Sequence, residues 1–458
     1  MKKLYLILAL SAFVFAGCND DSEDTNTNDT NLDNDLVEVL QTASGKSDAS
    51  AALEYFTMPE SAELSKIPAD PNNPLTAEKV TLGKFLFHET AMAINPKITS
   101  NKHTFSCASC HHVAADFQAG ARQGIGEGGV GFGSHGETRV PDSEMDKAMV
   151  DVQPERSPTA LNVAYQKEML WNGQFGALGQ NIGTDAQWTV GTPKEKNVLG
   201  FDGVETQAIA AQDVHRLGVD EELLTMGYKE LFEAAYPDKT EFTKIEAGLA
   251  MAAYERTLLA NKSPFQQWLK GDKGAMTPAQ KEGAILFFGE AGCSGCHTGP
   301  ALSSNSSLEV TESFYALGMG DLRGEGVLEN AVDFTKEDAG RGGFTGKEED
   351  NYKFKVPQLY NLKHMEFFGH GGTLHTLDEV VKYKNEGVPQ MQDLPSEKLS
   401  DKFVPLGLSA DEVAAIVIFL EEALYDDNLQ RYVPTTLPSG YAFPNNDEQS
   451  RKDLGMEQ

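Results

Sequence analysis

Two short motifs of the form Cys-x-x-Cys-His constrain this 458-residue chain more than any other feature. The first runs from Cys107 through Cys110 to His111, and the second runs from Cys293 through Cys296 to His297. This spacing lets two thiols bond covalently to one haem while the adjacent His binds the iron. We therefore expect two covalently bound haem c groups, attached at these four cysteines and ligated by the two histidines.

Two other interpretations of the four cysteines fit less well. A thioredoxin-like redox pair has no need of the His that follows each motif, and a shared zinc site would join pairs that lie far apart in the chain. Two haem groups also suit an exported protein, since haem is attached to such motifs outside the cytoplasm.

The fifth cysteine, Cys18, follows a segment typical of a secretory leader. Lys2 and Lys3 precede the apolar run 4–15, which is too short to span a bilayer, and small residues stand directly before Cys18. The pattern predicts a lipoprotein signal peptide over 1–17 and lipid attachment at Cys18. The alternative is ordinary cleavage near Ala16 that leaves a free thiol.

The leader predicts a location on the periplasmic or cell-surface side of a bacterial membrane, with the lipid as the only membrane contact. Residues 19–35 carry seven acidic residues and no basic one, which predicts a disordered acidic tether over 18–50. The formal net charge of −31 argues against nucleic acid as a partner and favours either a basic partner or simply a soluble, self-repelling surface.

The flanks of the two motifs resemble one another and predict a mainly α fold with two cytochrome c-like haem domains. Residues 83–87 (GKFLF) precede the first motif and residues 283–287 (GAILF) precede the second, each after a Thr typical of a helix start. Ser409 and Glu412 form a capping box before apolar residues at helical spacing, which predicts the closing helix of the second domain.

These signals divide the chain into domains. The turn-rich segment 261–276 is the expected linker. We expect an N-terminal haem domain over 51–265, a C-terminal haem domain over 275–432 and a tail over 433–458.

Over about residues 65–430 the chain resembles the bacterial di-haem cytochrome c peroxidases and their MauG-like relatives. The resemblance rests on both haem motifs and on four further segments: SPTALN (157–162), LWNG (170–173), FKVPQLYNL (354–362) and GHGGTLHTLDEVV (369–381). It implies that the N-terminal haem reacts with hydrogen peroxide and that the C-terminal haem receives electrons from a small c-type cytochrome or cupredoxin. Trp171, in the LWNG segment, matches the family's tryptophan between the haems.

The resemblance leaves three functions open. The first, and the one favoured, is a peroxidase that reduces hydrogen peroxide to water. The second is a MauG-like oxidase that acts on a protein or organic substrate. The third is an electron carrier with both irons fully ligated.

The chain departs from the family pattern on the peroxide side of the first haem. The family's blocking His lies sixteen residues past the proximal His, where this chain has Glu127. We expect a first haem that is open without reductive activation, with Glu127 near its distal pocket. Gln207 fits the family's Gln, but His215 or Arg216 stands where the family has a catalytic Glu. Either could act, His215 as acid and base or Arg216 by polarising the O–O bond.

The second haem also lacks the usual ligand. Fourteen residues after His370, where the peroxidases supply Met and the MauG-like enzymes Tyr, stands Lys384, beside Tyr383. We expect Tyr383 as the ligand first, Lys384 second and Met391 third. A phenolate or amine would lower the potential of this haem, whereas a thioether would raise it.

Calcium and oligomeric state stay open at this stage. The family's inter-domain calcium uses an Asn just before the SPT motif, where Arg156 or Ser157 stands here, and an Arg cannot bind calcium. Both a calcium-bound and a calcium-free protein are therefore compatible with the sequence, as are a monomer and a homodimer.

Overall fold

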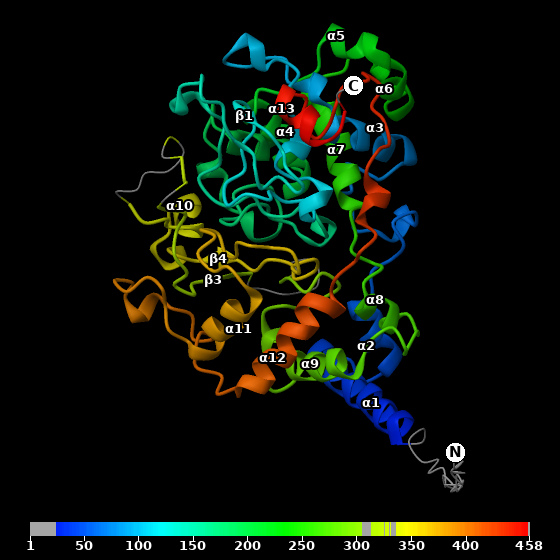
Figure 1. Cartoon of the computed structure of the whole chain (residues 1–458), viewed down its shortest axis with the longest axis vertical. Helices are drawn as coiled ribbons and strands as arrows, with labels where there is room; N and C mark the ends of the chain where they lie inside the picture. The colour runs from blue at the N-terminus through cyan, green and yellow to red at the C-terminus, as the bar shows by residue number, and fades with distance from the viewer. Residues whose placement is uncertain (1–23, 305–312, 325, 329, 331–335, 457–458) are drawn as a thin grey trace, which may run out of the picture.

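A computed structural model describes residues 24–304, 313–324, 326–328, 330 and 336–456. The predicted signal peptide and Cys18 lie outside these residues. The described chain is mainly helical and forms two lobes, one above the other in Figure 1. Its longer helices are α1 (Asp24–Ser44), α2 (Ala49–Phe56), α3 (Ala77–His88), α4 (Gly203–Val214), α7 (Lys244–Arg256), α9 (Pro278–Phe288), α11 (Leu377–Glu386) and α12 (Ala410–Ile418).

Short elements complete the fold. The shorter helices are α5 (Glu221–Leu223), α6 (Lys229–Ala235), α8 (Pro264–Leu269), α10 (Arg341–Thr345) and α13 (Glu448–Asp453). Two antiparallel strand pairs join β1 (Gly129–Val130) to β2 (Val140–Pro141) and β3 (Phe314–Tyr315) to β4 (Phe354–Lys355). Most of the remaining chain is 3-10 turns and irregular loop, as the many glycines favour.

Each lobe is built around the same helix crossing, which confirms the repeat seen in the sequence. Thr76 caps α3 and Thr277 caps α9, each through its side chain. A Cβ added at Gly83 of α3 would lie 1.9 Å from the Ala250 carbonyl oxygen of α7. A Cβ added at Gly283 of α9 would lie 2.0 Å from the Ala415 carbonyl oxygen of α12. Only glycine permits either close approach of two helix backbones.

We therefore expect Gly283→Ala to destabilise the C-terminal lobe. The added methyl group must push α9 away from α12, and overpacking of this kind costs about 1–3 kcal/mol or more. Chemical denaturation of the holoprotein checks this. Gly295→Ala is the matched control, because nothing lies within 4 Å of a Cβ built there. Equal free energies of unfolding for the two variants would contradict the close contact of α9 with α12 at Gly283.

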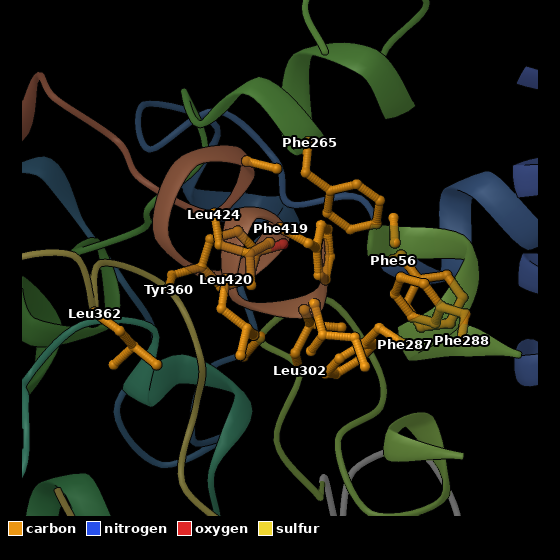
Figure 2. Packing of buried hydrophobic residues seen from close by; sticks show 14 of the residues in the cluster. Phe56, Phe265, Phe287, Phe288, Leu302, Tyr360, Leu362, Phe419, Leu420 and Leu424 are labelled. Carbon is orange, nitrogen blue, oxygen red and sulfur yellow. The ribbon is translucent and has the colours of Figure 1, made fainter. Parts of the chain in front are cut away.

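The core of the lower lobe is formed by segments far apart in the sequence (Figure 2). Phe287 and Phe288 of α9 pack against Phe419, which follows α12, and Phe288 also stacks on Phe265 of α8. Phe56 of α2 stacks its edge on Phe288 with ring centroids 5.1 Å apart. The predicted capping box of Ser409 and Glu412 is present at the start of α12.

The N-terminal segment differs from the expected tether, because residues 24–44 form the helix α1 on the C-terminal lobe. Leu36 and Leu40, one turn apart, are fully buried in that lobe's core. Asp29 and Asp33 pair with the buried ammonium of Lys281 on α9, the second at 2.8 Å. The acidic composition suggested disorder, but two of these acids neutralise a buried cation.

The domain limits change accordingly at both ends of the chain. Helices α1 and α2 pack in the C-terminal lobe, although residues from 51 were assigned to the N-terminal domain. The predicted tail 433–458 returns to the N-terminal lobe, where α13 lies against β1 (Figure 1). There Asp447 and Asp453 accept hydrogen bonds from the backbone N–H groups of Gly131, Phe132 and Gly133.

The predicted linker 261–276 is also more ordered than a turn-rich composition suggested. It contains α8, and the fully buried Trp268 donates its indole N–H to Asp33 at 2.7 Å. None of the helices in the described ranges is long and apolar enough to cross a membrane.

Candidate functional site

The two Cys-x-x-Cys-His motifs adopt the same local geometry. Each begins a 3-10 turn, and the backbone N–H of the His donates to the carbonyl of the first Cys at 3.1 Å in His111 and 3.0 Å in His297. Each turn gathers its two thiols and its imidazole within five residues. No disulfide joins the four cysteines.

Hydrogen bonds fix the tautomer of both histidines. His111 Nδ1 lies 3.3 Å from the Phe117 carbonyl oxygen, and His297 Nδ1 lies 2.9 Å from the Leu302 carbonyl oxygen. A carbonyl can only accept, so Nδ1 carries the proton and Nε2 presents a lone pair. Burial also lowers the pKa of both rings to about 4, which keeps them neutral as iron binding requires.

Each motif opens into a cavity. The N-terminal cavity, about 260 Å³, is lined by Cys107, Cys110 and His111. The C-terminal cavity, about 380 Å³, is lined by Cys293, Cys296 and His297. The thiols and the imidazole on the walls match the donor set that covalent haem needs, so both cavities fit the group.

Trp171 lines both cavities and so lies between them. Its indole N–H donates to the Arg156 carbonyl at 2.8 Å, which fixes the ring. Its ring centroid lies 6.4 Å from that of His370, and His370 stacks on Phe354 at 3.6 Å. The structure thus places aromatic rings at the wall that separates the cavities.

Helix α4 supplies part of the wall of the N-terminal cavity. Gln207 and Ala211 lie one turn apart on the lining face, and His215 follows at the end of the helix. His215 Nδ1 lies 2.7 Å from Asp151 Oδ2, and its Nε2 lies 3.4 Å from the Gln153 side-chain amide.

The environment of His215 raises its pKa. Burial lowers the pKa of His215, but the charge of Asp151 and the hydrogen bond to it outweigh burial, and the net direction is above the usual 6.5. Arg216 opposes the shift with its positive charge. A histidine held by a carboxylate in a cavity wall is suited to accepting and returning a proton near neutral pH.

The structure separates the other two predicted distal residues from the cavity wall. The Arg216 guanidinium pairs with the fully buried Glu127 carboxylate and lies 3.5 Å from Asp151. Neither Arg216 nor Glu127 lines the N-terminal cavity, although His215 does. Glu127 also accepts from the Ile98 backbone N–H at 3.1 Å, so it holds a loop rather than facing the cavity.

In the C-terminal lobe the structure also separates the three candidate ligands. Tyr383, the first expected ligand, donates its hydroxyl to the Leu317 carbonyl at 2.6 Å and does not line the cavity. Met391 does not line it either. Lys384 does. The geometry therefore favours Lys384, the second expected ligand, over Tyr383, the first.

Sequence reasoning missed a pair of acids on the wall of the N-terminal cavity. Glu155 and Asp338 both line it, and their carboxyl groups are hydrogen-bonded to each other. Burial, and then the charge of Asp338, raise the pKa of Glu155 well above its usual value. Glu255 of α7 lines the same cavity, and burial raises its pKa to about 8. The position of Glu155 directly before the RSPTALN run was the one available signal.

Arg156, one of the two residues at the position expected for a calcium ligand, is buried where the two lobes meet. The Arg156 guanidinium donates to the carbonyls of Ala121 and Ala119 and to the Gln118 side chain, and its backbone N–H donates to the His370 carbonyl. Within the described ranges, no group of three or more His, Cys, Asp or Glu is arranged to hold a metal ion.

Known proteins with similar sequences are di-haem enzymes, in agreement with the two haem motifs. Residues 77–274 match the family model of di-haem cytochrome c peroxidases. The chain is 30% identical over 393 residues to cytochrome-c peroxidase IdrP1 of Denitromonas iodatirespirans, covering 81% of this chain and 88% of the relative. The chain belongs to the di-haem cytochrome c peroxidase family.

Another relative of this di-haem peroxidase is the methylamine utilization protein MauG of Methylorubrum extorquens, at 28% identity over 82% of this chain and 84% of the relative. Among solved structures, a MauG-like protein associated with microbial copper homeostasis shares the fold, with a TM-score of 0.53 and 22% identity over 81% of this chain and 94% of that one. These matches confirm the predicted mainly α, two-domain haem fold and make the protein an oxidoreductase that uses haem.

Proposed function

We propose that this protein reduces hydrogen peroxide to two molecules of water, using two protons and two electrons from a small donor protein. The observation that carries the proposal is the N-terminal cavity, in which His111 faces a wall that bears Gln207 and the Asp151-held His215. Haem bound at this motif supplies the iron at which peroxide binds and the electrons that cleave its O–O bond.

The residues of the cavity wall move the protons. His215 Nε2 accepts the proton from one peroxide oxygen and returns it to the other oxygen as that atom leaves as water. Asp151 holds the ring in the tautomer with the proton on Nδ1, so that Nε2, which lies 3.4 Å from the Gln153 amide, carries the lone pair that accepts the proton. The Gln207 amide donates a hydrogen bond to the oxygen on which charge develops.

Trp171, whose side chain forms part of both cavity walls, would lie between haems held at the two motifs and would provide the path for electrons from the C-terminal to the N-terminal one. The donor is a c-type cytochrome or a cupredoxin, and the acidic chain favours a basic docking face on it.

Signal cleavage and lipid attachment at Cys18 place the protein on the outer side of a bacterial membrane.

Asp151→Asn is expected to move the pH dependence of turnover. His215 acts first as a base and must be neutral, so kcat/KM for peroxide should rise with pH through the pKa of His215. Asp151 raises that pKa, and its removal should move the rising limb to lower pH. Steady-state rates between pH 4 and 9 check the shift, and an unmoved limb would contradict the role of His215.

The decisive test of the function is steady oxidation of reduced cytochrome c by the holoprotein in the presence of peroxide. We expect two cytochromes oxidised per peroxide over many turnovers. A long-lived oxidised protein that leaves the cytochrome reduced would instead support a MauG-like oxidase. No reaction with peroxide at all would support an electron carrier.

A further inference from the structure

Helix α11 turns one face towards the C-terminal cavity. Leu377, Val380, Val381 and Lys384 line it, at the three- and four-residue spacing of one helix face. The first three are apolar, as expected beside a porphyrin. Lys384 places an amine at the fourth position of this otherwise apolar face of α11, and an amine at such a position suggests a specific role.

Lys384 is half-buried, and its amine lies near aromatic rings. In the part of the chain that the structure describes, no carboxylate or hydrogen-bond acceptor pairs with Nζ, which lies 5.4 Å from the Tyr383 ring centroid and 5.6 Å from that of Phe403. The cysteines on which its electrostatic environment depends, Cys293 and Cys296, become uncharged thioethers once haem is attached. A permanently protonated ammonium would therefore be costly there.

The other cationic side chains on this cavity, Arg156, Lys355 and Lys402, each donate hydrogen bonds. Lys402 donates to the Gly295 carbonyl at 3.3 Å and to the Tyr315 hydroxyl at 3.1 Å. Tyr383 is engaged through its hydroxyl by the Leu317 carbonyl. Lys384 is thus the nitrogen donor that the fold leaves available on the wall formed by α11.

We propose that the neutral amine of Lys384 binds the iron of the C-terminal haem opposite His297. The inference rests on the proposed di-haem function and gives the electron-entry haem a His–Lys ligand pair. Burial lowers the pKa of Lys384 to about 8, which brings the neutral amine within reach near neutral pH. An amine favours oxidised iron more than a thioether does, so this haem should have a lower potential than a His–Met haem.

The test uses the full-length ferric holoprotein and its Lys384→Ala, Lys384→Met and Lys402→Ala variants. Electron paramagnetic resonance reports the spin state of each haem, and near-infrared magnetic circular dichroism separates amine from thioether ligands. We expect Lys384→Ala to convert the low-spin haem to high spin, and Lys384→Met to restore low spin with a thioether band and a higher potential. Lys402→Ala should keep the wild-type spectrum.

A low-spin second haem that survives Lys384→Ala would overturn the proposal, because another ligand would then bind the iron, or Lys384 would pair with a haem propionate. Peroxide-dependent cytochrome oxidation is measured separately. If the protein still oxidises cytochrome with peroxide but Lys384→Ala has the wild-type spectrum, only the ligand assignment is wrong. If the spectrum responds to Lys384 and no peroxide is consumed, only the proposed function is wrong.

Discussion

Replacing His215 by Ala should lower kcat/KM for hydrogen peroxide by about 10²–10⁴-fold, the usual contribution of a positioned acid–base group. His215 lines the N-terminal cavity, and its Nδ1 is held by Asp151 at 2.7 Å, so its Nε2 is positioned to exchange a proton with the substrate. The measurement is the initial rate of cytochrome oxidation at low peroxide, on protein that carries two haems per chain.

His135→Ala is the matched control for this variant. His135 is also a histidine of the N-terminal lobe, but its side chain is 39% exposed, pairs with Glu137 and does not line the cavity. Its rate should equal that of the wild type. If His215→Ala retained more than half of the wild-type rate, the proton exchange would have to be assigned elsewhere, with Glu155 as the next residue on the wall.

Arg256→Ala should lower the free energy of unfolding by about 3–5 kcal/mol, the cost of leaving a buried charge unpaired. The Arg256 guanidinium is 1% exposed and bonds both oxygens of the fully buried Glu205, at 2.8 and 2.7 Å. It also reaches Asp202 at 3.4 Å and the Pro68 carbonyl at 3.1 Å. Since Glu205 is on α4, this pair also fixes the helix that carries Gln207 and leads to His215.

Chemical denaturation of the holoprotein measures the effect, with Lys102→Ala as the control. Lys102 and Glu222 form a comparable pair at 2.6 Å, but both side chains are exposed, and such pairs contribute about 0–1 kcal/mol. The double variant Arg256→Met with Glu205→Leu should lie nearer the wild type than Arg256→Ala does, because no charge stays unpaired. Equal stabilities of Arg256→Ala and Lys102→Ala would contradict this account.

The features that the sequence predicted well are local ones. The haem motifs, the helix starts at Thr76 and Thr277 and the capping box at Ser409 each depend on a few neighbouring residues. The sequence showed Gly83 and Gly283 as part of a repeat before the two motifs. The structure explains these glycines, because α3 crosses α7 and α9 crosses α12 too closely for any side chain.

The features that the sequence did not predict depend on contacts between distant segments. The acids of α1 were assigned to a tether because their partner, Lys281, lies about 250 residues away. Arg216 was a candidate for the distal pocket because its ion pair with Glu127 cannot be seen in the sequence. Asp338 and Glu155 lie 183 positions apart in the chain and share no sequence motif, so nothing local placed them side by side.

The electron paramagnetic resonance spectrum of the ferric wild-type holoprotein tests most directly whether the first haem is open to peroxide. We predict one high-spin haem, at the N-terminal cavity, and one low-spin haem, at the C-terminal cavity. Two low-spin haems would mean that a side chain such as His215 closes the N-terminal iron, and the peroxidase account would then be wrong.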